Sequence, residues 1–509
     1  MITHRLSSSL LTPLLKPQTL LISSQLRCRR MASSQASAFG LKDPSLIKFQ
    51  GLIDGKWVDA KDGAKIVVKN PASNQELGTV PEMGLAETEE AIAAAAKAFP
   101  AWSTTTAKER HDILLKMYAL MQQHHDDLGR LITLENGKTL TEGKGENTYS
   151  SSFIEVRNID SIPSYDMIFT ALNISAEEAI RTYGEQIPSA FKNVRNIVIK
   201  QPVGVVSIMT PWNFPSAMIT RKLGAALAAG CTTVIKPPPE TPFSALALAE
   251  LASRAGVPDG VINVVTTEKN VAAVGKQIVS LEAGGNAPFI VFDDANIDEA
   301  VAAAIVCKFR GSGQTCVCAN RIYVHSTVYA EFASRLAEKV AAFKIGDGLD
   351  ESTTHGPLIH SRATEKVTRH IEDAVSKGAQ VLVGGKVVEN TNFFQPTVLS
   401  DVPSDALIND EETFGPLAAL VKFDTEDEVI KLANATEVGL AGYFFSRDIG
   451  RAWRVAERLE VGMVAVNTGL ISQAVIPFGG VKESGLGREG GPHGIDEYMN
   501  EKLIVFGGL

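Results

Sequence analysis

The sequence predicts an α/β protein built mainly on doubly wound parallel sheets. From Ile197 onward, short apolar runs typical of strands alternate with longer helical runs, which is the order that βαβ units produce. The chain has 509 residues with 42 glycines and 6% aromatic residues, which fits a turn-rich chain with alanine-rich helices. Because this length exceeds one simple core, we expect two to four domains or a large α/β protein.

Composition excludes several other classes of protein. With 45% hydrophobic residues, 21% charged residues and a net charge of −9, the chain is typical of a soluble globular protein. The longest uncharged stretch, Gln201 to Thr220, contains three prolines, so we expect no membrane span. No basic tract follows the first thirty residues, so we expect no nucleic-acid partner. Five cysteines without framework spacing argue against a disulfide-stabilised secreted protein.

The N-terminal segment differs in charge from the rest of the chain. No Asp or Glu precedes Asp43, and Arg and Ser are frequent in the first thirty residues. This pattern predicts a transit peptide over residues 1–42 and a mitochondrial protein. The alternatives are a disordered tail or translation from Met31, which would give a cytoplasmic protein.

The first part of the chain predicts short strands followed by helices. Residues 47–70 alternate in polarity and carry glycines at turns. Helical patterns follow over 85–99 and about 106–123. A third helix is expected to end at Asn136-Gly137, where glycine can adopt the left-handed conformation.

Strands and helices then alternate to about Val466. Strands are expected at 203–209, 232–236, 261–265, 288–294 and 321–324, and helices at 216–229, 244–255, about 298–309 and 330–343.

Cys316 is the candidate nucleophile. It lies in the Gly-flanked segment Gly313-Gln314-Thr315-Cys316, between a predicted helix and a predicted strand, where backbone N–H groups and Arg310 can tune its thiolate. A cysteine in a loop more often has no catalytic role. Metal binding is the other alternative, but Cys-x-Cys without a second Cys/His pair is poor zinc spacing, so we predict no metal site.

Six motifs occur together in one order: PWNFP (211–215), TTVIKP (232–237), SLEAGGNAP (280–288), GQTC (313–316), EETFGP (411–416) and PFGGVKESGLGREGG (477–491). The chain therefore resembles the aldehyde dehydrogenase superfamily from Lys48 to Leu509. GQTCVCANR and GIDEYMNEKLIVFGGL bring the resemblance closest to the succinate-semialdehyde dehydrogenases.

The resemblance implies a covalent mechanism for oxidising an aldehyde. Cys316 matches the nucleophile, and Glu282 the general base that activates the deacylating water. Asn213, with the backbone N–H of Cys316, matches the donors to the oxyanion. Without its flanking motif, Glu282 would be taken for a surface residue.

Three further residues match the positions that bind the substrate carboxylate: Arg221, Arg310 and Ser472. Arg221 follows Asn213 by eight residues, about two helical turns, so we expect both on one helix face. Bidentate pairing with arginine would select an acidic aldehyde. The alternative for either arginine is an ordinary surface ion pair.

Cys318 resembles the second cysteine of relatives that are regulated by a disulfide in the catalytic loop. It is equally consistent with a small buried residue.

The resemblance also implies NAD or NADP as the cofactor. Trp212, Lys236, Glu412 and Phe414 match cofactor-binding positions. The usual Lys-Pro-x-Glu is altered to Lys236-Pro237-Pro238-Pro239, and a carboxylate there would repel a 2′-phosphate. We therefore expect NADP to be accepted, with NAD possible.

Two stretches depart from the family pattern. The interval from Lys236 to Glu282 spans only 46 residues, shorter than usual by about thirty. It lacks the segment whose helix N-terminus faces the cofactor pyrophosphate. In addition, Val156–Ser175 interrupts what would be one helix and matches nothing in the family. A skipped segment and a retained intron in the gene would produce these two changes, which place the activity of this chain in doubt.

The resemblance therefore predicts the aldehyde dehydrogenase fold: a cofactor domain (43–185 and 203–284), a catalytic domain (285–486) and a β-rich arm (186–202 and 487–509). We expect oxidation of succinic semialdehyde in 4-aminobutyrate degradation by a homodimer or homotetramer. The alternatives are a dehydrogenase for another acidic aldehyde, such as glutarate semialdehyde, and a catalytically silent variant that co-assembles with intact subunits.

Overall fold

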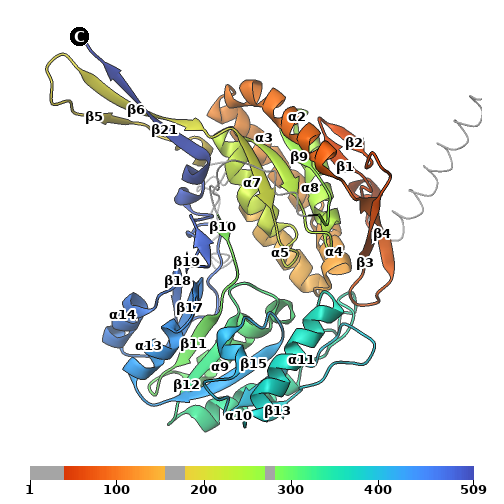
Figure 1. Cartoon of the computed structure of the whole chain (residues 1–509), viewed down its shortest axis with the longest axis vertical. Helices are drawn as coiled ribbons and strands as arrows, with labels where there is room; N and C mark the ends of the chain where they lie inside the picture. The colour runs from red at the N-terminus through yellow and green to blue at the C-terminus, as the bar shows by residue number, and fades with distance from the viewer. Residues whose placement is uncertain (1–38, 155–177, 270–280) are drawn as a thin grey trace, which may run out of the picture.

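The computed structural model describes residues 39–154, 178–269 and 281–509. The chain forms two α/β parts, each with its own sheet, and a ribbon of strands that projects from the first part (Figure 1). The stretch Val156–Ser175 lies outside the described residues, as do the first 38 residues.

The first part is built on a five-stranded sheet in the order β2-β1-β9-β8-β7. Its strands are β1 (Gly51–Ile53), β2 (Lys56–Val58), β7 (Val205–Met209), β8 (Thr232–Lys236) and β9 (Ile262–Val264). Strands β7, β8 and β9 are parallel, as the βαβ pattern predicted, whereas β1 pairs antiparallel with β9. A separate hairpin joins β3 (Lys65–Lys69) to β4 (Glu76–Pro81).

Helices cover both faces of this sheet. They are α2 (Leu85–Ser103), α3 (Ala107–Gln123), α4 (His125–Asn136), α5 (Leu140–Ser152), α7 (Ala217–Ala229) and α8 (Pro242–Ala255). Successive side chains of β8 point to opposite faces. Val234 packs with Ala91 and Ala95 of α2, whereas Ile235 joins the larger core that contains α7 and α8.

Local signals in the sequence set the ends of these helices. The predicted helix over about 106–123 is α3, where Thr106 and Glu109 form a capping box. The helix α4 ends at Asn136 as predicted, because Gly137 takes a φ of 86°.

The second part is built on a seven-stranded sheet in the order β13-β14-β15-β12-β11-β17-β18. Its strands are β11 (Ala287–Val291), β12 (Ala319–His325), β13 (Gln380–Val383), β14 (Thr397–Ser400), β15 (Leu417–Phe423), β17 (Ala441–Phe445) and β18 (Met463–Val466). All neighbours pair in parallel except β13 and β14.

Two apolar cores lie on the two faces of this second sheet. One contains α9 (Ile297–Phe309) and α10 (Tyr329–Ala341), and the other contains α11 (Ser361–Ser376), α13 (Glu426–Asn434) and α14 (Ile449–Arg458). Helices on both faces are what a buried parallel sheet requires. The α/β class with parallel sheets that the sequence predicts is therefore confirmed.

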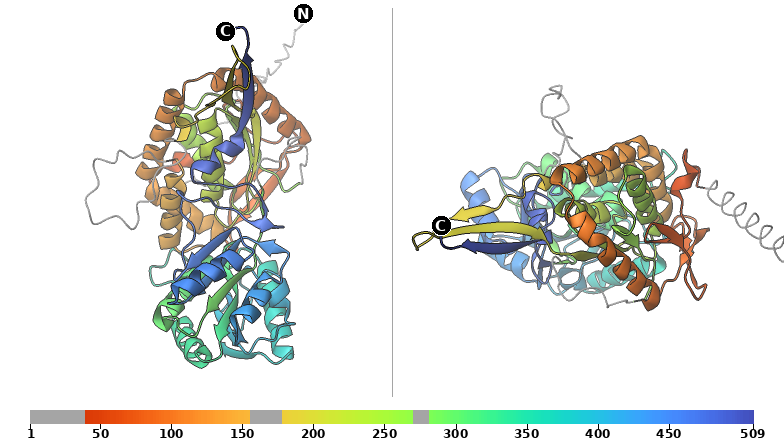
Figure 2. Two further views of the ribbon diagram at one scale, coloured as in Figure 1. Left: turned by 90° about the vertical axis from the view of Figure 1, so that its left-hand side faces the viewer. Right: turned by 90° about the horizontal axis from the view of Figure 1, so that it is seen from above.

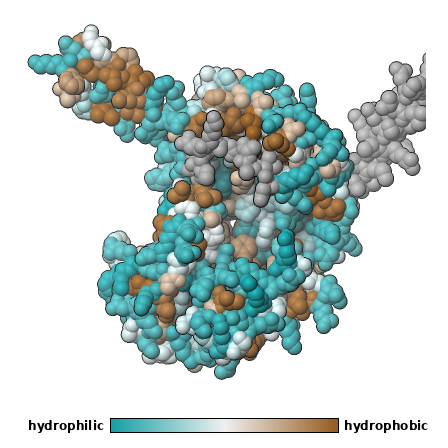
Figure 3. All heavy atoms as spheres, in the orientation of Figure 1, coloured by the Kyte–Doolittle hydropathy of each residue, from teal (hydrophilic) through white to brown (hydrophobic). Residues whose placement is uncertain are grey.

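A three-stranded ribbon in the order β21-β6-β5 projects from the body in all three ribbon views (Figures 1 and 2). It consists of β5 (Glu185–Ile187), β6 (Arg195–Pro202) and β21 (Met499–Phe506). Apolar side chains gather on it (Figure 3): Phe191 is 75% exposed and Leu503 60% exposed. The domain boundaries stay predictions, although each predicted domain contains one of these sheets.

The chain crosses between its parts near β10 (Leu281–Glu282), which pairs antiparallel with β20 (Gly485–Leu486). Within the described residues β7 is a terminal strand of the first sheet, and its Met209 is 59% exposed. The interval before Glu282 is short, and the loss of a strand from a parallel sheet leaves a new edge. The terminal position of β7 is consistent with such a loss.

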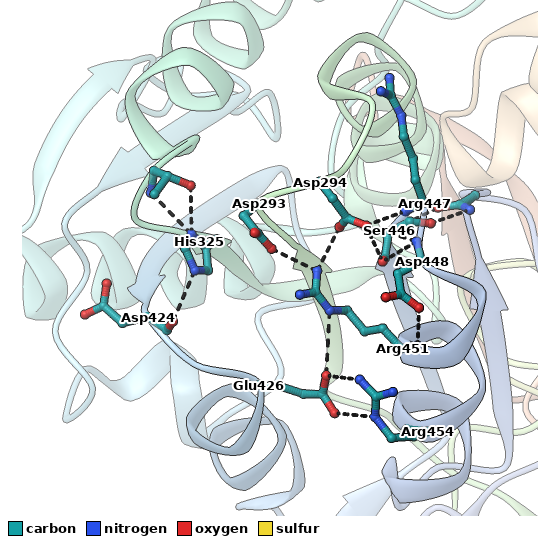
Figure 4. A network of polar contacts seen from close by, with 12 residues as sticks. Asp293, Asp294, His325, Asp424, Glu426, Ser446, Arg447, Asp448, Arg451 and Arg454 are labelled. Atoms are coloured by element: carbon teal, nitrogen blue, oxygen red, sulfur yellow. Dashed lines mark hydrogen bonds and ion pairs between the residues drawn. The ribbon is translucent and has the colours of Figure 1, made fainter.

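Asp294 anchors the chain at the end of β11 (Figure 4). Its Oδ2 accepts hydrogen bonds from Ser446 Oγ at 2.9 Å and from the backbone N–H of Arg447 and Asp448 at 2.9 and 3.0 Å. Its Oδ1 pairs with Arg451 Nη1 at 2.8 Å. Partial burial acts to raise the pKa of Asp294, but these hydrogen bonds and Arg451 outweigh it and lower that pKa.

We expect Asp294→Ala to lower the free energy of unfolding by about 1–3 kcal/mol, because three donors lose their acceptor. Since the native pKa of Asp294 is lowered, its contribution is fully present above the unfolded pKa of about 3.9. The contribution is lost as the pH falls through the native pKa. Urea unfolding at pH 7 and at acidic pH measures both effects, and an equal difference between the two proteins at each pH would contradict the assignment.

Candidate active site

The candidate nucleophile lies between the two parts of the chain. Cys316 follows a short 3-10 helix (Arg310–Gly313) and precedes β12. Gly311 and Ser312 both adopt left-handed φ values, 58° and 55°, which turn the chain sharply before the cysteine. Cys316 is half-buried, as an accessible nucleophile requires.

The structure brings Glu282 to Cys316. Glu282 lies on β10, interacts with the Cys316 thiol, and has an Oε1 atom that is buried with no hydrogen-bond partner among the described residues. Burial raises the pKa of Glu282 above its ordinary value. Burial also raises the pKa of the Cys316 thiol well above its ordinary value, and the neighbouring carboxylate raises it further. The negative charge of either group therefore disfavours loss of the proton from the other.

Asn213 lies beside the loop that carries Cys316. Its side chain is 2% exposed, and its Nδ2 donates to the carbonyl of Gln314 at 3.2 Å, two residues before Cys316. The expectation that Asn213 and Arg221 share a helix face was wrong in its premise. The helix α7 begins only at Ala217, so Asn213 lies in the turn before it.

The two candidate arginines differ in their surroundings. Arg221 is 5% exposed, pairs with Glu489 at 3.1 Å and donates to the hydroxyl of Tyr149 at 3.1 Å. Arg310 is half-buried and lies over the ring of Phe214, 5.8 Å from its centre, with no carboxylate partner among the described residues. Arg310 is therefore the guanidinium available to an incoming anion.

Ser472 is half-buried in the loop after β18, and no polar contact brings it to the other site residues within the described part of the chain. Its loop nevertheless runs against α9: a Cβ on Gly469 would lie 2.4 Å from the carbonyl oxygen of Ala303. The loop is thus held close to the helix that leads to Arg310.

One lysine and one carboxylate near these residues, Lys222 and Glu489, were not predicted as site residues. Lys222 pairs with Glu489 at 2.6 Å, and both Arg221 and Lys222 act electrostatically on Glu282. Glu489 is buried, and its two cationic partners lower its pKa although burial acts in the opposite direction. The signal available in the sequence was its place in the motif at 477–491.

Cys318 is 7% exposed, and its thiol donates to the carbonyl of Lys308 at 3.6 Å. Cys316 and Cys318 are both free thiols. Lys308 is fully buried, and its Nζ has no hydrogen-bond partner within the described residues. Among the residues that the structure describes, no group of His, Cys, Asp and Glu side chains is arranged to hold a metal ion.

Of the residues predicted for the cofactor, Trp212, Glu412 and Phe414 lie near the loop that carries Cys316, whereas Lys236 lies in the first sheet. Trp212 and Phe414 pack edge to face with ring centres 5.4 Å apart, close to the catalytic loop. Glu412 approaches the backbone of Gly284 and Gly285, and burial raises its pKa to about 7. Lys236 ends β8 in the first sheet, where burial lowers its pKa and Glu240 opposes that change.

An open cavity of about 570 Å³ lies between the two parts. Pro239, Glu240 and Glu268 line it from the first part, and His360, Ser361 and Thr364 from the second. Its size is typical of small-molecule sites. Neither Lys236 nor Glu412 lines this cavity, although Pro239 and Glu240 follow Lys236 closely along the chain. Residues 270–280 lie outside the described part of the chain.

In the described residues, no helix is both long and apolar enough to cross a membrane.

Three relatives are similar to this chain over nearly its whole length. A glutarate-semialdehyde dehydrogenase of Pseudomonas putida is 54% identical over 91% of this chain and 99% of its own. A succinate-semialdehyde dehydrogenase [NADP(+)] of Escherichia coli is 52% identical over 92% and 99%. A mitochondrial succinate-semialdehyde dehydrogenase of Homo sapiens is 48% identical over 96% and 92%. The last alignment spans 520 positions, more than the 509 residues of this chain, so this chain lacks residues that the relative has.

Two solved structures are similar to this chain in both sequence and fold. An NADP-dependent enzyme of Escherichia coli is 52% identical with a TM-score of 0.86, over 92% of this chain and 100% of its own. A betaine aldehyde dehydrogenase of Staphylococcus aureus in complex with NAD+ is 32% identical with a TM-score of 0.84, over 93% and 97%. The sequence profile of the aldehyde dehydrogenase family matches residues 57–280 and 269–504, two pieces that meet just before Glu282. The chain belongs to the aldehyde dehydrogenase family.

Proposed function

We propose that this protein oxidises succinic semialdehyde to succinate with NAD or NADP, as a step in 4-aminobutyrate degradation. Two of the three relatives described above are succinate-semialdehyde dehydrogenases, at 52% and 48% identity. The observation that carries the proposal is the surroundings of Arg310, which has no carboxylate partner among the described residues and lies six positions before Cys316.

A carboxylate on the substrate completes this arrangement. Arg310 would receive it while the aldehyde carbon at the other end of the molecule meets the thiol of Cys316. Arg221 shares its charge with Glu489, so its role would be to add positive potential and to orient Tyr149. Ser472 would contribute a hydroxyl from its loop.

The covalent step would proceed as follows. The sulfur of Cys316 adds to the aldehyde carbon, and the carbonyl π electrons move to the oxygen, which becomes an oxyanion. Asn213 Nδ2 and the N–H of Cys316 would donate to that oxygen, since the Asn213 amide already faces the catalytic loop. A bound nicotinamide dinucleotide supplies the hydride acceptor that this oxidation requires. Collapse of the oxyanion leaves a thioester on Cys316.

Glu282 would then act as general base. It takes a proton from water, and the resulting hydroxide attacks the thioester carbon. The C–S bond then breaks to release the acid, and the proton held by Glu282 passes to the departing sulfur of Cys316. Its raised pKa suits this role, because a more basic carboxylate accepts a proton more readily.

Cofactor choice is proposed as NAD or NADP. Pro239 replaces the carboxylate that would repel a 2′-phosphate, which favours acceptance of NADP. Glu240 nevertheless lines the same cavity and acts on Lys236, so a carboxylate is still present one position later.

A second candidate substrate is glutarate semialdehyde, which has one more methylene. The relative at 54% identity is named for that substrate, and a single guanidinium at the far end of a pocket tolerates a small change in chain length. A third candidate is a silent subunit that co-assembles with intact ones, because the family profile matches in two pieces that meet where about thirty residues are missing.

We propose a mitochondrial location, supported by the acid-free N-terminus and by the human relative that is named as mitochondrial. We also propose a homodimer or homotetramer. The exposed apolar side chains of the β21-β6-β5 ribbon support it, because such a surface is stabilised by a second copy.

The test of function is oxidation of succinic semialdehyde, followed at 340 nm with NAD and with NADP. Butanal, which has the same number of carbons without the carboxylate, is the matched neutral substrate. The same assay on a version with about thirty residues restored before Glu282 separates the active enzyme from the silent subunit. Activity in the restored version alone would favour the silent subunit, and equal kcat/KM for both aldehydes would contradict the proposed substrate.

We expect Arg310→Ala to raise KM for succinic semialdehyde by about tenfold to a hundredfold, because a charge-assisted hydrogen bond of about 1.5–3 kcal/mol is lost. KM for butanal is expected to stay near the wild-type value. Arg454→Ala, which removes an exposed arginine from α14, is the matched control. An unchanged KM for succinic semialdehyde would exclude Arg310 as the carboxylate anchor.

We expect Glu282→Gln to shift alkylation of Cys316 to lower pH, since the carboxylate that raises the pKa of this thiol is removed. The same variant should lower turnover by about a hundredfold or more, because the general base is lost. The rate of reaction with iodoacetamide against pH measures the first effect, with Cys316→Ser as the background. A profile that stays in place or moves to higher pH would contradict the coupling of the two groups.

We propose that Cys318 forms a reversible disulfide with Cys316, in which peroxide oxidises two thiols and is reduced to water. Wild type should lose activity in peroxide and recover it with dithiothreitol. Cys318→Ala should be inactivated without recovery, because Cys316 then proceeds to higher oxidation states. Full recovery of this variant would show that Cys318 is only a small buried residue.

A further inference from the structure

One face of α5 contacts both elements that carry the arginines. Glu142, Glu146 and Tyr149 are spaced by four and three residues, so they lie on one side of this helix. None of the three was predicted as a site residue, and none carries the chemistry proposed above.

Glu142 holds the turn next to Arg310. Its Oε1 accepts the backbone N–H of Gly311 at 2.7 Å, and its Oε2 caps α5 at Thr139. The N–H of Gly311 belongs to the left-handed turn formed by Gly311 and Ser312, which is a conformation that needs support from its surroundings. A hydrogen bond at this point therefore determines the direction in which Arg310 leaves the main chain.

Glu146 holds the start of the helix that carries Arg221. It is 3% exposed, and its Oε1 accepts the N–H groups of Ser216 and Ala217 at 2.9 and 3.3 Å. These N–H groups lie at the N-terminus of α7 and have no acceptor within the helix, so a carboxylate is well placed to accept from them. Its Oε2 pairs at 2.6 Å with Lys138, which in turn donates to the carbonyl of Asn213 at 2.6 Å.

Tyr149 contacts the side chain of Arg221 directly. Its hydroxyl accepts from Arg221 Nη2 at 3.1 Å, and its ring packs edge to face on Phe153 with centres 5.0 Å apart. The hydroxyl also interacts electrostatically with Arg310 and Cys316, so Tyr149 lies near both arginines and Cys316.

We propose that this face of α5 is the positioning element that sets the positions of Arg310 and Arg221, and through them the preference for an acidic over a neutral aldehyde. The inference rests on the proposed function, because it concerns the same carboxylate site. Glu142 and Glu146 act through the main chain of the two elements, and Tyr149 acts directly on Arg221.

The decisive comparison is Glu142→Ala against Glu142→Gln. The alanine variant leaves the N–H of Gly311 without its acceptor, and we expect the ratio of kcat/KM for succinic semialdehyde to that for butanal to fall about tenfold. The glutamine variant keeps an oxygen that accepts the same N–H, so it should retain most of the wild-type ratio. Tyr149→Phe, which removes one hydroxyl, should lower the ratio about threefold.

Thr139→Ala is the matched control for loss of the helix cap. It weakens the N-terminus of α5 as Glu142→Ala does, but it leaves the contact to Gly311 in place. We expect it to lower Tm and to leave the ratio unchanged. An equal fall of the ratio in Thr139→Ala and Glu142→Ala would mean that α5 acts only on stability and would overturn the inference. A ratio unchanged in both Glu142→Ala and Tyr149→Phe would overturn it as well.

Binding of the product succinate, measured by calorimetry, gives a readout that does not need turnover. Glu142→Ala should weaken it about tenfold and Glu142→Gln should not, and the opposite order would overturn the inference even in an inactive chain. The wild-type protein distinguishes a failure of the proposed function from a failure of the role of α5. A wild-type chain that prefers neither succinic semialdehyde to butanal nor succinate to butanamide removes the proposed function. A strong wild-type preference that none of the α5 variants changes removes only the role of α5.

Discussion

The buried ion pair between Lys138 and Glu146 determines where the main chain of the site lies. The two side chains are 6% and 1% exposed and meet at 2.6 Å. A buried charge without a partner is strongly destabilising, so each holds the other in place. Their remaining hydrogen bonds go to backbone atoms: Lys138 to the carbonyl of Asn213, and Glu146 to the first N–H groups of α7. The position of Asn213 and the start of the Arg221 helix therefore depend on one polar contact.

The same principle extends across the reactive centre. Arg221 and Lys222 share Glu489, and their positive charges act on Glu282, which in turn raises the pKa of Cys316. Each of these electrostatic interactions joins two charged or ionisable groups, and water would weaken the interaction if the groups were exposed. Because both are buried, the charge of Cys316 and the charge of Glu282 each affect the pKa of the other group. Arg221 and Lys222 compensate the negative charge that develops when Glu282 loses its proton.

The chain also shows how much of a family fold a shortened cofactor region leaves in place. The strands β7, β8 and β9 keep their parallel order, Lys236 ends β8, and Glu412 lies against the backbone of Gly285. The first sheet ends at β7 within the described residues, with Val205 and Met209 exposed at that strand. Buried area in the cofactor part is thus the feature most affected, whereas the catalytic sheet and its two cores are complete.

The sequence by itself determined the order of strands and helices, and it predicted the nucleophile loop and the base. Apolar periodicity, the capping box at Thr106 and the glycine after Asn136 are local signals, and the motifs around Cys316 and Glu282 are contiguous. Only the tertiary structure decided what faces the site. The sequence of α5, LTEGKGENTYSSS, is polar almost throughout and carries no apolar periodicity, which is typical of an exposed helix. In the fold, Glu146 is buried and Tyr149 meets Arg221, because partners from residues far along the chain satisfy their polar groups. Local patterns cannot contain such partners, and for the same reason the helix-face argument for Asn213 failed while the residue itself was correctly placed near the nucleophile.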